Sequence, residues 1–250
     1  MKHIKAIGFD LFNTLITAKP HAIDEAVSRL IRSLEQSGLA IDHEVFKQAH
    51  WEAALRFMKE TRRDGRETHN RFWISAALDT QGHNIPPDDP RIASAVDAYF
   101  STFFECCYLI PGTKEMLGFL KGQYHLGLLS NFTHVPAVMK IIDGLELTSF
   151  FDVVLVSGEL GYRKPHPLVF RRLIEQLGVE KNRIIYIGDD LESDITGARQ
   201  AGLHPIWMTY VRDHDIPLAP GVPYAQPEKP DSNIPRISTW KELLPLLDRK

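Results

Sequence analysis

The chain has 250 residues, enough for one large domain or for a core with an inserted module. A hydrophobic fraction of 44% and a charged fraction of 24% are ordinary for a soluble globular protein, and a net charge of −3 with both signs interspersed gives no reason to expect a nucleic-acid or membrane partner. The sequence contains no apolar run of about 18 residues, so we expect no membrane span.

The N-terminus and the cysteines bear on the compartment. Met1 to Ile4 lead directly into a short apolar run and show no signal-peptide pattern. Cys106 and Cys107 are adjacent and match neither a CxxC redox pattern nor a zinc pattern. We therefore expect a cytoplasmic protein with two reduced, mostly buried thiols. We expect this protein to be a monomer or a homodimer.

The first predicted element is a buried strand over residues 4–9, which runs into a polar turn at Asp10. The long stretch from there to Pro111 shows no clear strand and has helical periodicity over 23–37 and 43–60. It is too long for a loop in a compact domain. We therefore predict an all-helical module, residues 17–107, inserted into an α/β core formed by residues 1–16 and 108–250.

Beyond the helical module, short β-branched apolar runs alternate with helical patterns. Helices are predicted over 111–122 and 166–177, and strands over 125–130, 152–156, 183–188 and 205–210. This alternation is typical of a parallel sheet that is buried on both faces. The predicted core is therefore Rossmann-like, with helices on both sides of the sheet.

The last part of the chain is rich in proline. Prolines at six positions between 217 and 235 predict an extended surface strap. A short strand over 236–238 and a helix over 239–248 are predicted to close the chain.

Four polar segments follow predicted strands or begin a helix. They contain Asp10, Ser130 with Asn131, Lys164, and the acidic run 188–194. Taken singly, each is explained as a helix cap, a turn or a solvated charge. Because the carboxyl ends of parallel strands meet at one edge of a sheet, we instead expect the four segments to converge on one site.

The order and spacing of these segments resemble the haloacid dehalogenase (HAD) superfamily over essentially the whole chain. Asp10-Leu-Phe12-Asn13-Thr14 is similar to its first motif, Asp-x-Asp-x-Thr/Val, in which the first aspartate is the nucleophile. Ser130 corresponds to the second motif, Lys164 in Lys-Pro-x-Pro to the third, and Gly188-Asp189-Asp190 with Asp194 to the fourth. The helical module resembles the cap that closes over the site in one class of this superfamily.

The resemblance implies a role for each matching residue. Mg²⁺ would bind Asp10, the backbone carbonyl of Phe12 and Asp189, while Asp194 would orient a metal-bound water. Lys164 would keep Asp10 ionised and bind the transferring group. Ser130 is the third candidate catalytic residue, expected to bind the oxygens of the transferring group, and the candidates for substrate binding are Asn13, Thr14 and Asn131. Asp190 could serve in either acidic role or in neither.

Position 12 departs from the phosphatase pattern. In family phosphatases the second aspartate of motif one protonates the leaving group and later activates water, and such catalysis contributes roughly 10²–10⁴-fold. Phe12 cannot transfer a proton. A histidine of the helical module could replace the missing acid, or the substrate could carry a leaving group that needs none; the candidate histidines are His21, His50 and His69.

An aromatic residue at this position also resembles the 2-haloacid dehalogenases, whose motif reads Asp-x-Tyr-x-Thr and whose halide leaving group needs no proton. Those enzymes work without Mg²⁺, lack the acidic Gly-Asp-Asp, and bind the substrate carboxylate and halide with a cap arginine. The candidates for such an arginine are Arg32, Arg56, Arg62, Arg63, Arg66 and Arg71.

The sequence thus predicts a hydrolase with an aspartate nucleophile and a small-molecule substrate. Mg²⁺-dependent hydrolysis of a phosphate ester is the first hypothesis, metal-independent dehalogenation the second, and binding of a phosphorylated ligand without turnover the third. Aromatic residues of the helical module that could line its pocket are Trp51, Phe57, Phe72 and Trp73.

Overall fold

The computed structural model describes residues 4–219 and 233–247. A six-stranded sheet forms its centre, in the order β5-β4-β1-β6-β7-β8, and all five neighbouring pairs are parallel. The strands are β1 (Ala6–Phe9), β4 (His125–Ser130), β5 (Val153–Val156), β6 (Ile184–Gly188), β7 (His204–Met208) and β8 (Arg236–Ile237). The predicted α/β fold with a parallel sheet is confirmed.

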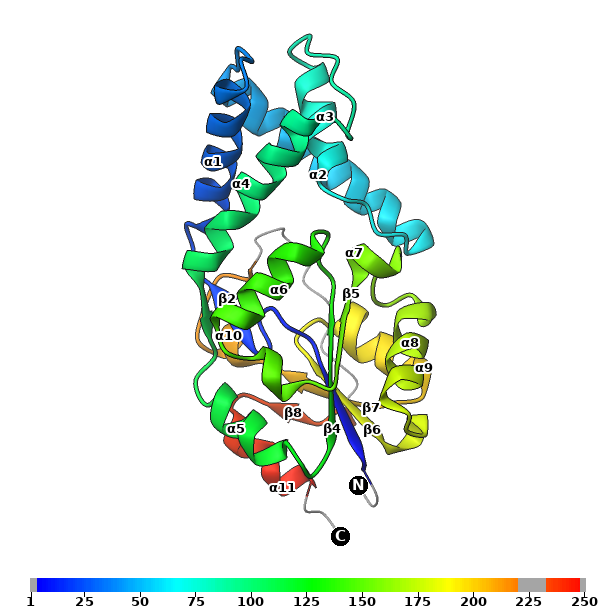
Figure 1. Cartoon of the computed structure of the whole chain (residues 1–250). Helices are drawn as coiled ribbons and strands as arrows, with labels where there is room; N and C mark the ends of the chain where they lie inside the picture. The colour runs from blue at the N-terminus through cyan, green and yellow to red at the C-terminus, as the bar shows by residue number, and fades with distance from the viewer. Residues whose placement is uncertain (1–3, 220–232, 248–250) are drawn as a thin grey trace.

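Helices cover both faces of the sheet. Alternate side chains of β1 point to opposite faces, and each face has its own apolar cluster. Ile7 and Phe9 pack with the face covered by α5 (Thr113–Leu120) and α6 (Val135–Gly144). Ala6 packs on the other face. The helices there are α8 (Pro167–Leu177) and α9 (Gly197–Ala201). Figure 1 shows these two layers on either side of the strands.

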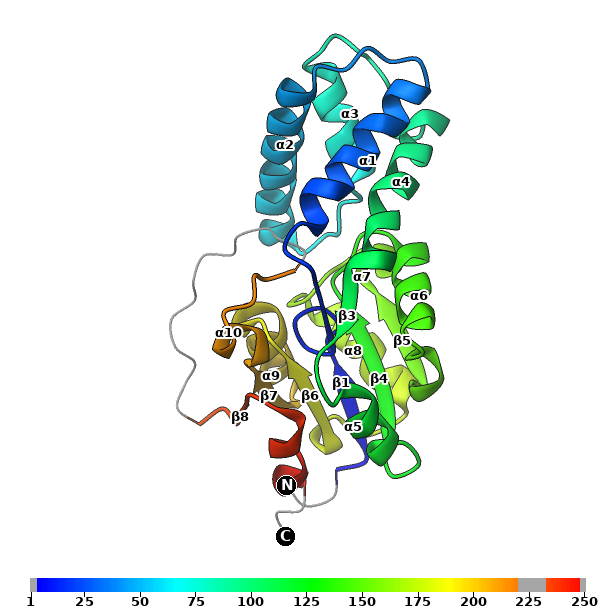
Figure 2. The same ribbon diagram turned by 90° about the vertical axis from the view of Figure 1, so that its left-hand side faces the viewer.

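Four long helices make up most of the helical module. They stand beyond the carboxyl ends of the strands in both views (Figures 1 and 2). They are α1 (Ala22–Gln36), α2 (His43–Asp64), α3 (Arg71–Asp79) and α4 (Pro90–Cys106). Asp42 caps α2 by accepting hydrogen bonds from Glu44 N and Val45 N, and Gly65 ends it in the left-handed conformation.

A two-stranded antiparallel sheet joins the helical module to the rest of the chain. β2 (Ile16–Ala18) pairs with β3 (Cys107–Leu109) in a register that places Thr17 opposite Tyr108. The sequence analysis missed both strands because three residues are too few to show a period. They lie at the boundaries predicted for the two domains, and the division into 1–16 with 108–250 and 17–107 stays a prediction.

The remaining elements are short. They are η1 (Thr148–Phe150), α7 (Ser157–Leu160), η2 (Lys181–Arg183), the π-helical turn η3 (Leu191–Thr196), α10 (Tyr210–Asp213), η4 (Trp240–Glu242) and α11 (Leu244–Leu247). The helix predicted over 239–248 is instead two short pieces, η4 and α11. Pro245 follows Leu244, and because proline has no N–H it favours a new helix start at this point.

Three further predictions can be compared with the fold. Of the proline-rich strap, residues 220–232 lie outside the described residues. Cys106 and Cys107 are buried and neither forms a disulfide, and burial raises the pKa of the Cys107 thiol to about 12. Within the described ranges, no helix has the length and apolar character needed to span a bilayer.

Candidate functional site

The candidate site lies at the carboxyl end of β1, in the middle of the sheet. β1 pairs with β4 on one side and with β6 on the other, so the residues that follow these three strands are neighbours. Asp10 follows β1, and its backbone N–H donates to the carbonyl of Ile187 at 2.9 Å. Asp189 follows β6, and Asp194 lies in η3; all three aspartates are buried.

Lys164 lies at the centre of the site and is almost completely buried. Its ammonium contacts Asp10 Oδ1 at 2.6 Å and Asp194 Oδ1 at 2.7 Å. It also donates to the Leu129 carbonyl and to the Tyr186 hydroxyl, both at 2.9 Å. Burial disfavours the charged ammonium, but Asp10 and Asp194 outweigh this effect and raise the pKa of Lys164 well above its usual value.

The three aspartates form a cluster in which negative charge exceeds positive charge. One carboxylate oxygen of each of Asp10, Asp189 and Asp194 lies within 4.8 Å of the others. Burial, reinforced by Asp10 and Asp194, raises the pKa of Asp189 well above its usual value. Burial also raises the pKa of Asp194 to about 7, although Lys164 opposes that shift. An oxygen-rich group of this kind fits a hard divalent cation such as Mg²⁺.

The turn after β6 fixes Asp194 in this cluster. The Asp190 carboxylate accepts hydrogen bonds from Glu192 N at 3.0 Å and Ser193 N at 2.6 Å, which caps η3. The Asp190 N–H donates to Asp194 Oδ2 at 3.0 Å. A Cβ on Gly188 would lie 2.3 Å from Asp194 Cγ, so only glycine allows this close approach.

The predicted substrate-binding residues make internal hydrogen bonds. Thr14 Oγ1 donates to Asp10 Oδ2 at 3.2 Å. The Asn13 amide forms hydrogen bonds with the backbone N–H and the carbonyl of Ala219. The Asn131 amide likewise forms hydrogen bonds with the backbone N–H and the carbonyl of Lys164. Ser130 ends β4 and is buried. Contact of these four side chains with a substrate stays a prediction.

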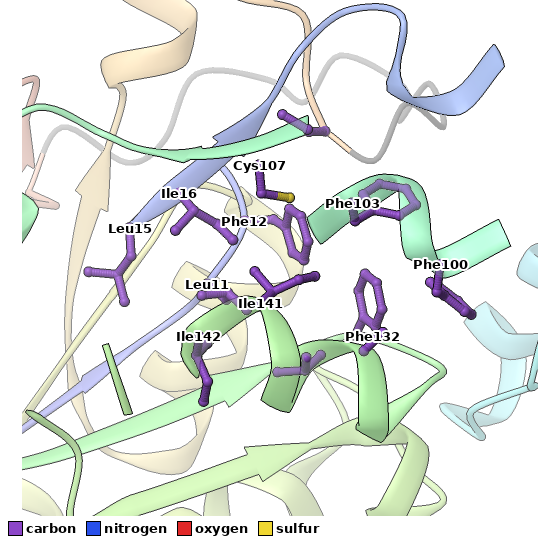
Figure 3. Close-up of a cluster of buried hydrophobic side chains, with 14 of the residues drawn as sticks. Leu11, Phe12, Leu15, Ile16, Phe100, Phe103, Cys107, Phe132, Ile141 and Ile142 are labelled. Atoms are coloured by element: carbon purple, nitrogen blue, oxygen red, sulfur yellow. The ribbon is translucent and has the colours of Figure 1, made fainter. Parts of the chain in front are cut away.

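The side chain of Phe12 packs in an aromatic cluster instead of pointing into water. Its ring stacks on Phe132 with centroids 5.2 Å apart and meets Phe103 edge-on at 6.4 Å. Figure 3 shows Phe12 beside Phe103 of α4 and Phe132, with Phe100 on the other side of Phe132. The helical module therefore covers the position where family phosphatases carry their second aspartate.

A cavity that is partly open to solvent lies between the site and the helical module. On the side of the sheet it is lined by charged residues, among them Asp10, Lys164 and Asp189. On the side of the helical module its lining residues are uncharged: Ile23, Met58, Asn70, Trp73, Tyr99, Phe100 and Phe103.

Most of the candidate residues that the sequence analysis named in the helical module do not line this cavity. Among the described residues, neither a histidine nor any of the six candidate arginines lines the cavity. His50 is buried against Phe46, and burial lowers the pKa of its imidazole to about 4. Of the four candidate aromatic residues, Trp73 lines the cavity and Trp51, Phe57 and Phe72 do not.

The sequence analysis missed several residues of the site, among them Tyr186, Arg212 and Asn70. Tyr186 holds the Lys164 ammonium, but as an aromatic residue within an apolar strand it gave no functional signal. Arg212 and Asn70 line the cavity from segments far from the four motifs. Only the three-dimensional arrangement of the helical module and the C-terminal part of the core brings them to the site.

Comparison with known proteins identifies the family to which this chain belongs. A family model described as haloacid dehalogenase-like hydrolase matches residues 4–202. A glyceraldehyde 3-phosphate phosphatase of Pyrococcus abyssi is 30% identical over 208 residues, which are 83% of this chain and 82% of that protein. A ribulose-1,5-bisphosphate 5-phosphatase of Halopiger xanaduensis is 31% identical over 203 residues, 80% of this chain and 83% of that protein.

Solved structures show the same fold at lower identity. A 2-haloacid dehalogenase from Pseudomonas syringae pv. Tomato has a TM-score of 0.73 and 21% identity, with 98% of this chain and 99% of that chain covered. The HAD hydrolase YfnB of Bacillus subtilis, bound to magnesium, has a TM-score of 0.63 and 22% identity, with 99% and 100% covered. The chain belongs to the haloacid dehalogenase-like hydrolases.

Proposed function

We propose that this hydrolase cleaves small-molecule phosphate monoesters in a Mg²⁺-dependent reaction with Asp10 as its nucleophile. The observation that carries the proposal is the cluster of three buried carboxylates around Lys164, with oxygens within 4.8 Å of one another. A nucleophile alone needs no such group of acids, whereas a phosphoryl-transfer site needs cations to offset the negative charge of the substrate. The phosphatases among the relatives support the same reaction.

The donor atoms suit Mg²⁺, which prefers oxygen ligands and keeps several waters. Asp10, Asp189 and the backbone carbonyl of Phe12 would hold the ion directly. The Asp194 carboxylate already forms an ion pair with Lys164 and accepts a hydrogen bond from the Asp190 N–H. It therefore suits the role of orienting a metal-bound water without contacting the metal itself. Mg²⁺, when bound, would neutralise charge on the phosphoryl oxygens.

The protein's own groups would act as follows. Asp10 attacks phosphorus and forms an aspartyl-phosphate while the bond to the leaving oxygen breaks. Lys164 keeps Asp10 ionised and stabilises the charge that develops on the phosphoryl group. Water then cleaves the aspartyl-phosphate and restores Asp10. Because Phe12 can neither donate nor accept a proton, ester oxygens that leave readily as anions are the preferred leaving groups.

One observation favours dehalogenation as a second candidate. Phe12 packs in an aromatic cluster, and a halide would leave from such a site without a proton. Two features weigh against it: the acidic cluster, and the absence of the six candidate arginines from the described cavity wall. Binding without turnover, the third hypothesis, leaves the pairing of Asp10 with Lys164 unexplained.

A paired assay tests the proposal. Phosphate release from aryl phosphates and halide release from 2-haloacids are each measured with Mg²⁺ and with EDTA. We expect phosphate release that EDTA abolishes and that Asp10→Asn lowers to background. Halide release that persists in EDTA would establish dehalogenation instead, and the absence of both products would favour the binding protein.

A further inference from the structure

One polar side chain in the cavity wall has hydrogen-bonding groups that the protein does not use. Asn70 precedes α3 and is 1% exposed, and in the described part of the chain neither its Nδ2 nor its Oδ1 has a hydrogen-bond partner. The indole N–H of Trp73, one turn along α3, is likewise buried without a partner among the described residues. Both residues line the cavity.

Buried amides are almost always paired, because an unpaired one loses its hydrogen bonds to water and gains nothing in return. Asn70 is not explained as a helix cap, since its side chain makes no capping hydrogen bond to α3. An unpaired amide and an unpaired indole N–H, in two side chains that line the same cavity, are therefore explained most simply by a polar group on a ligand.

The surroundings of Asn70 restrict the charge of that group. The other lining residues of the helical module are apolar or, like Tyr99, neutral, since burial raises the pKa of the Tyr99 hydroxyl to about 12. The two arginines of the described cavity wall belong to the core: Arg163 pairs with Glu67 at 3.4 Å, and Arg212, whose Nε has no hydrogen-bond partner among the described residues, lies in α10. A carboxylate at Asn70 would be buried without a cation from the helical module.

We propose that Asn70 and Trp73 form a specificity-determining subsite for an uncharged hydroxyl group on the leaving-group part of the substrate. A hydroxyl both donates and accepts, so it can satisfy Asn70 Oδ1 and the N–H donors of Asn70 and Trp73 together. A carboxylate only accepts and an ammonium only donates. The inference rests on the proposed function, because that function places the phosphoryl group at Asp10. The substrate class is therefore a hydroxylated, otherwise uncharged phosphate monoester.

The test compares p-alkylphenyl phosphates with p-(ω-hydroxyalkyl)phenyl phosphates whose alkyl chains have one to three carbons, so that the leaving phenolate needs no proton in either ester. We expect the wild type to prefer the hydroxylated ester by about tenfold in kcat/KM at the chain length that matches the cavity. Asn70→Leu, which keeps the volume and removes both polar atoms, should lose this preference. Its Tm should equal or exceed that of the wild type, because an unpaired buried amide has been replaced by an apolar group.

Thr102→Val is the matched control. The Thr102 hydroxyl is also buried without a partner in the described residues, but it lies on α4 away from the cavity lining. This variant should keep both the activity and the preference. Trp73→Phe, which keeps ring packing and removes only the indole N–H, should weaken the preference and serves as the test if Asn70→Leu does not fold.

Equal kcat/KM for both esters at every chain length would overturn the subsite proposal. A preference for the hydroxylated ester that survives in Asn70→Leu would also overturn it. If Asn70→Leu does not fold, the same criterion applies to Trp73→Phe. Calorimetric titration of both esters into Asp10→Asn separates this outcome from failure of the proposed function. If the wild type hydrolyses neither ester but Asp10→Asn binds the hydroxylated one more tightly, only the phosphatase proposal fails. If the two esters bind equally, the subsite fails.

Discussion

The side chain of Phe12 occupies the position at which family phosphatases carry a proton donor. Its ring is fixed between Phe132 and Phe103, so the position is part of the contact between core and helical module as well as of the cavity wall. Its backbone carbonyl remains a possible metal ligand. In the proposed mechanism, position 12 therefore keeps the metal ligand of motif one and lacks its proton donor.

Restoring an acid should change how the rate depends on the leaving group. In the wild type, kcat/KM, which reports the first chemical step, should fall steeply as the pKa of the leaving alcohol rises, because no side chain at position 12 supplies a proton. Phe12→Asp should raise kcat/KM for alkyl phosphates by roughly 10²-fold and leave kcat/KM for aryl phosphates nearly unchanged. A series of esters with graded leaving-group pKa values measures this slope.

Phe12→Leu is the control, because it removes the ring contacts without adding a proton donor. Both variants should have a lower Tm than the wild type, since each loses the stacking on Phe132. Only Phe12→Asp should flatten the dependence on leaving-group pKa. Identical slopes in the two variants would mean that proton transfer does not limit the reaction.

At the residue scale, the sequence predicted the side chains that directly follow strands. Asp10 and Asp189 each come one position after an apolar run, so their position at the edge of the sheet follows from the parallel topology. Tyr186 and Asn70 could not be predicted in the same way. Tyr186 has the pattern of a core aromatic, and the position of Asn70 depends on how the helical module packs on the core.

The short turn between β6 and α9 is the element that organises the acidic cluster. It contains η3, whose capping residue Asp190 also donates its N–H to Asp194. The approach of Asp194 to the backbone at Gly188 leaves no room for a side chain there. The proposed metal site therefore depends on a glycine at position 188, because any side chain there would displace Asp194.

Gly188→Ala should weaken Mg²⁺ binding without unfolding the protein. The new Cβ would lie 2.4 Å from Asp194 Oδ2, so the carboxylate must move away from its contacts with Lys164 and Asp190. Loss of such an outer contact typically lowers metal affinity by roughly 10–100-fold. Calorimetric titration with Mg²⁺ gives the affinity, and circular dichroism verifies the fold.

The matched control for this prediction is Gly118→Ala in α5, where the nearest contact of an added Cβ is Phe150 at 3.9 Å. This variant should bind Mg²⁺ as the wild type does. If Gly188→Ala also binds Mg²⁺ with wild-type affinity, Asp194 has no part in holding the metal or its waters.

At the element scale, the core strands were predictable because each is a short apolar run between helical patterns. The elements that were missed or wrong are short or interrupted. β2 and β3 have three residues each, and Pro245 divides the last predicted helix. In such segments tertiary contacts, and not local periodicity, decide the structure.

Considered as a whole, the molecule has the charged residues of the proposed catalytic site on one side of a cavity and the proposed substrate contacts on the other. The charged residues come from loops and helical turns of the α/β core, and the lining residues of the helical module are uncharged. Several contacts join the two sides, among them His69 to His134 at 3.3 Å and Glu67 to Arg163 at 3.4 Å. An enclosed site excludes bulk water, which strengthens the electrostatic interactions within it.

The sequence predicted the insertion of a helical module but not the face that it presents to the site. That face depends on the packing of α1, α3 and α4 and on the course of β2 and β3, which involve contacts between residues far apart in the chain. This is why Trp73 could not be distinguished from Trp51, Phe57 and Phe72 as a cavity residue.

The central claim is that Asp10 carries the phosphoryl group during the reaction. Because Phe12 cannot activate the water of the second step, the aspartyl-phosphate should accumulate and product alcohol should be released in an initial burst. The most direct measurement is acid quench during turnover of an aryl phosphate with Mg²⁺, followed by mass spectrometry of the peptide that contains Asp10. We predict the added mass of one phosphoryl group on Asp10; turnover that leaves this peptide unmodified and shows no burst would contradict the account.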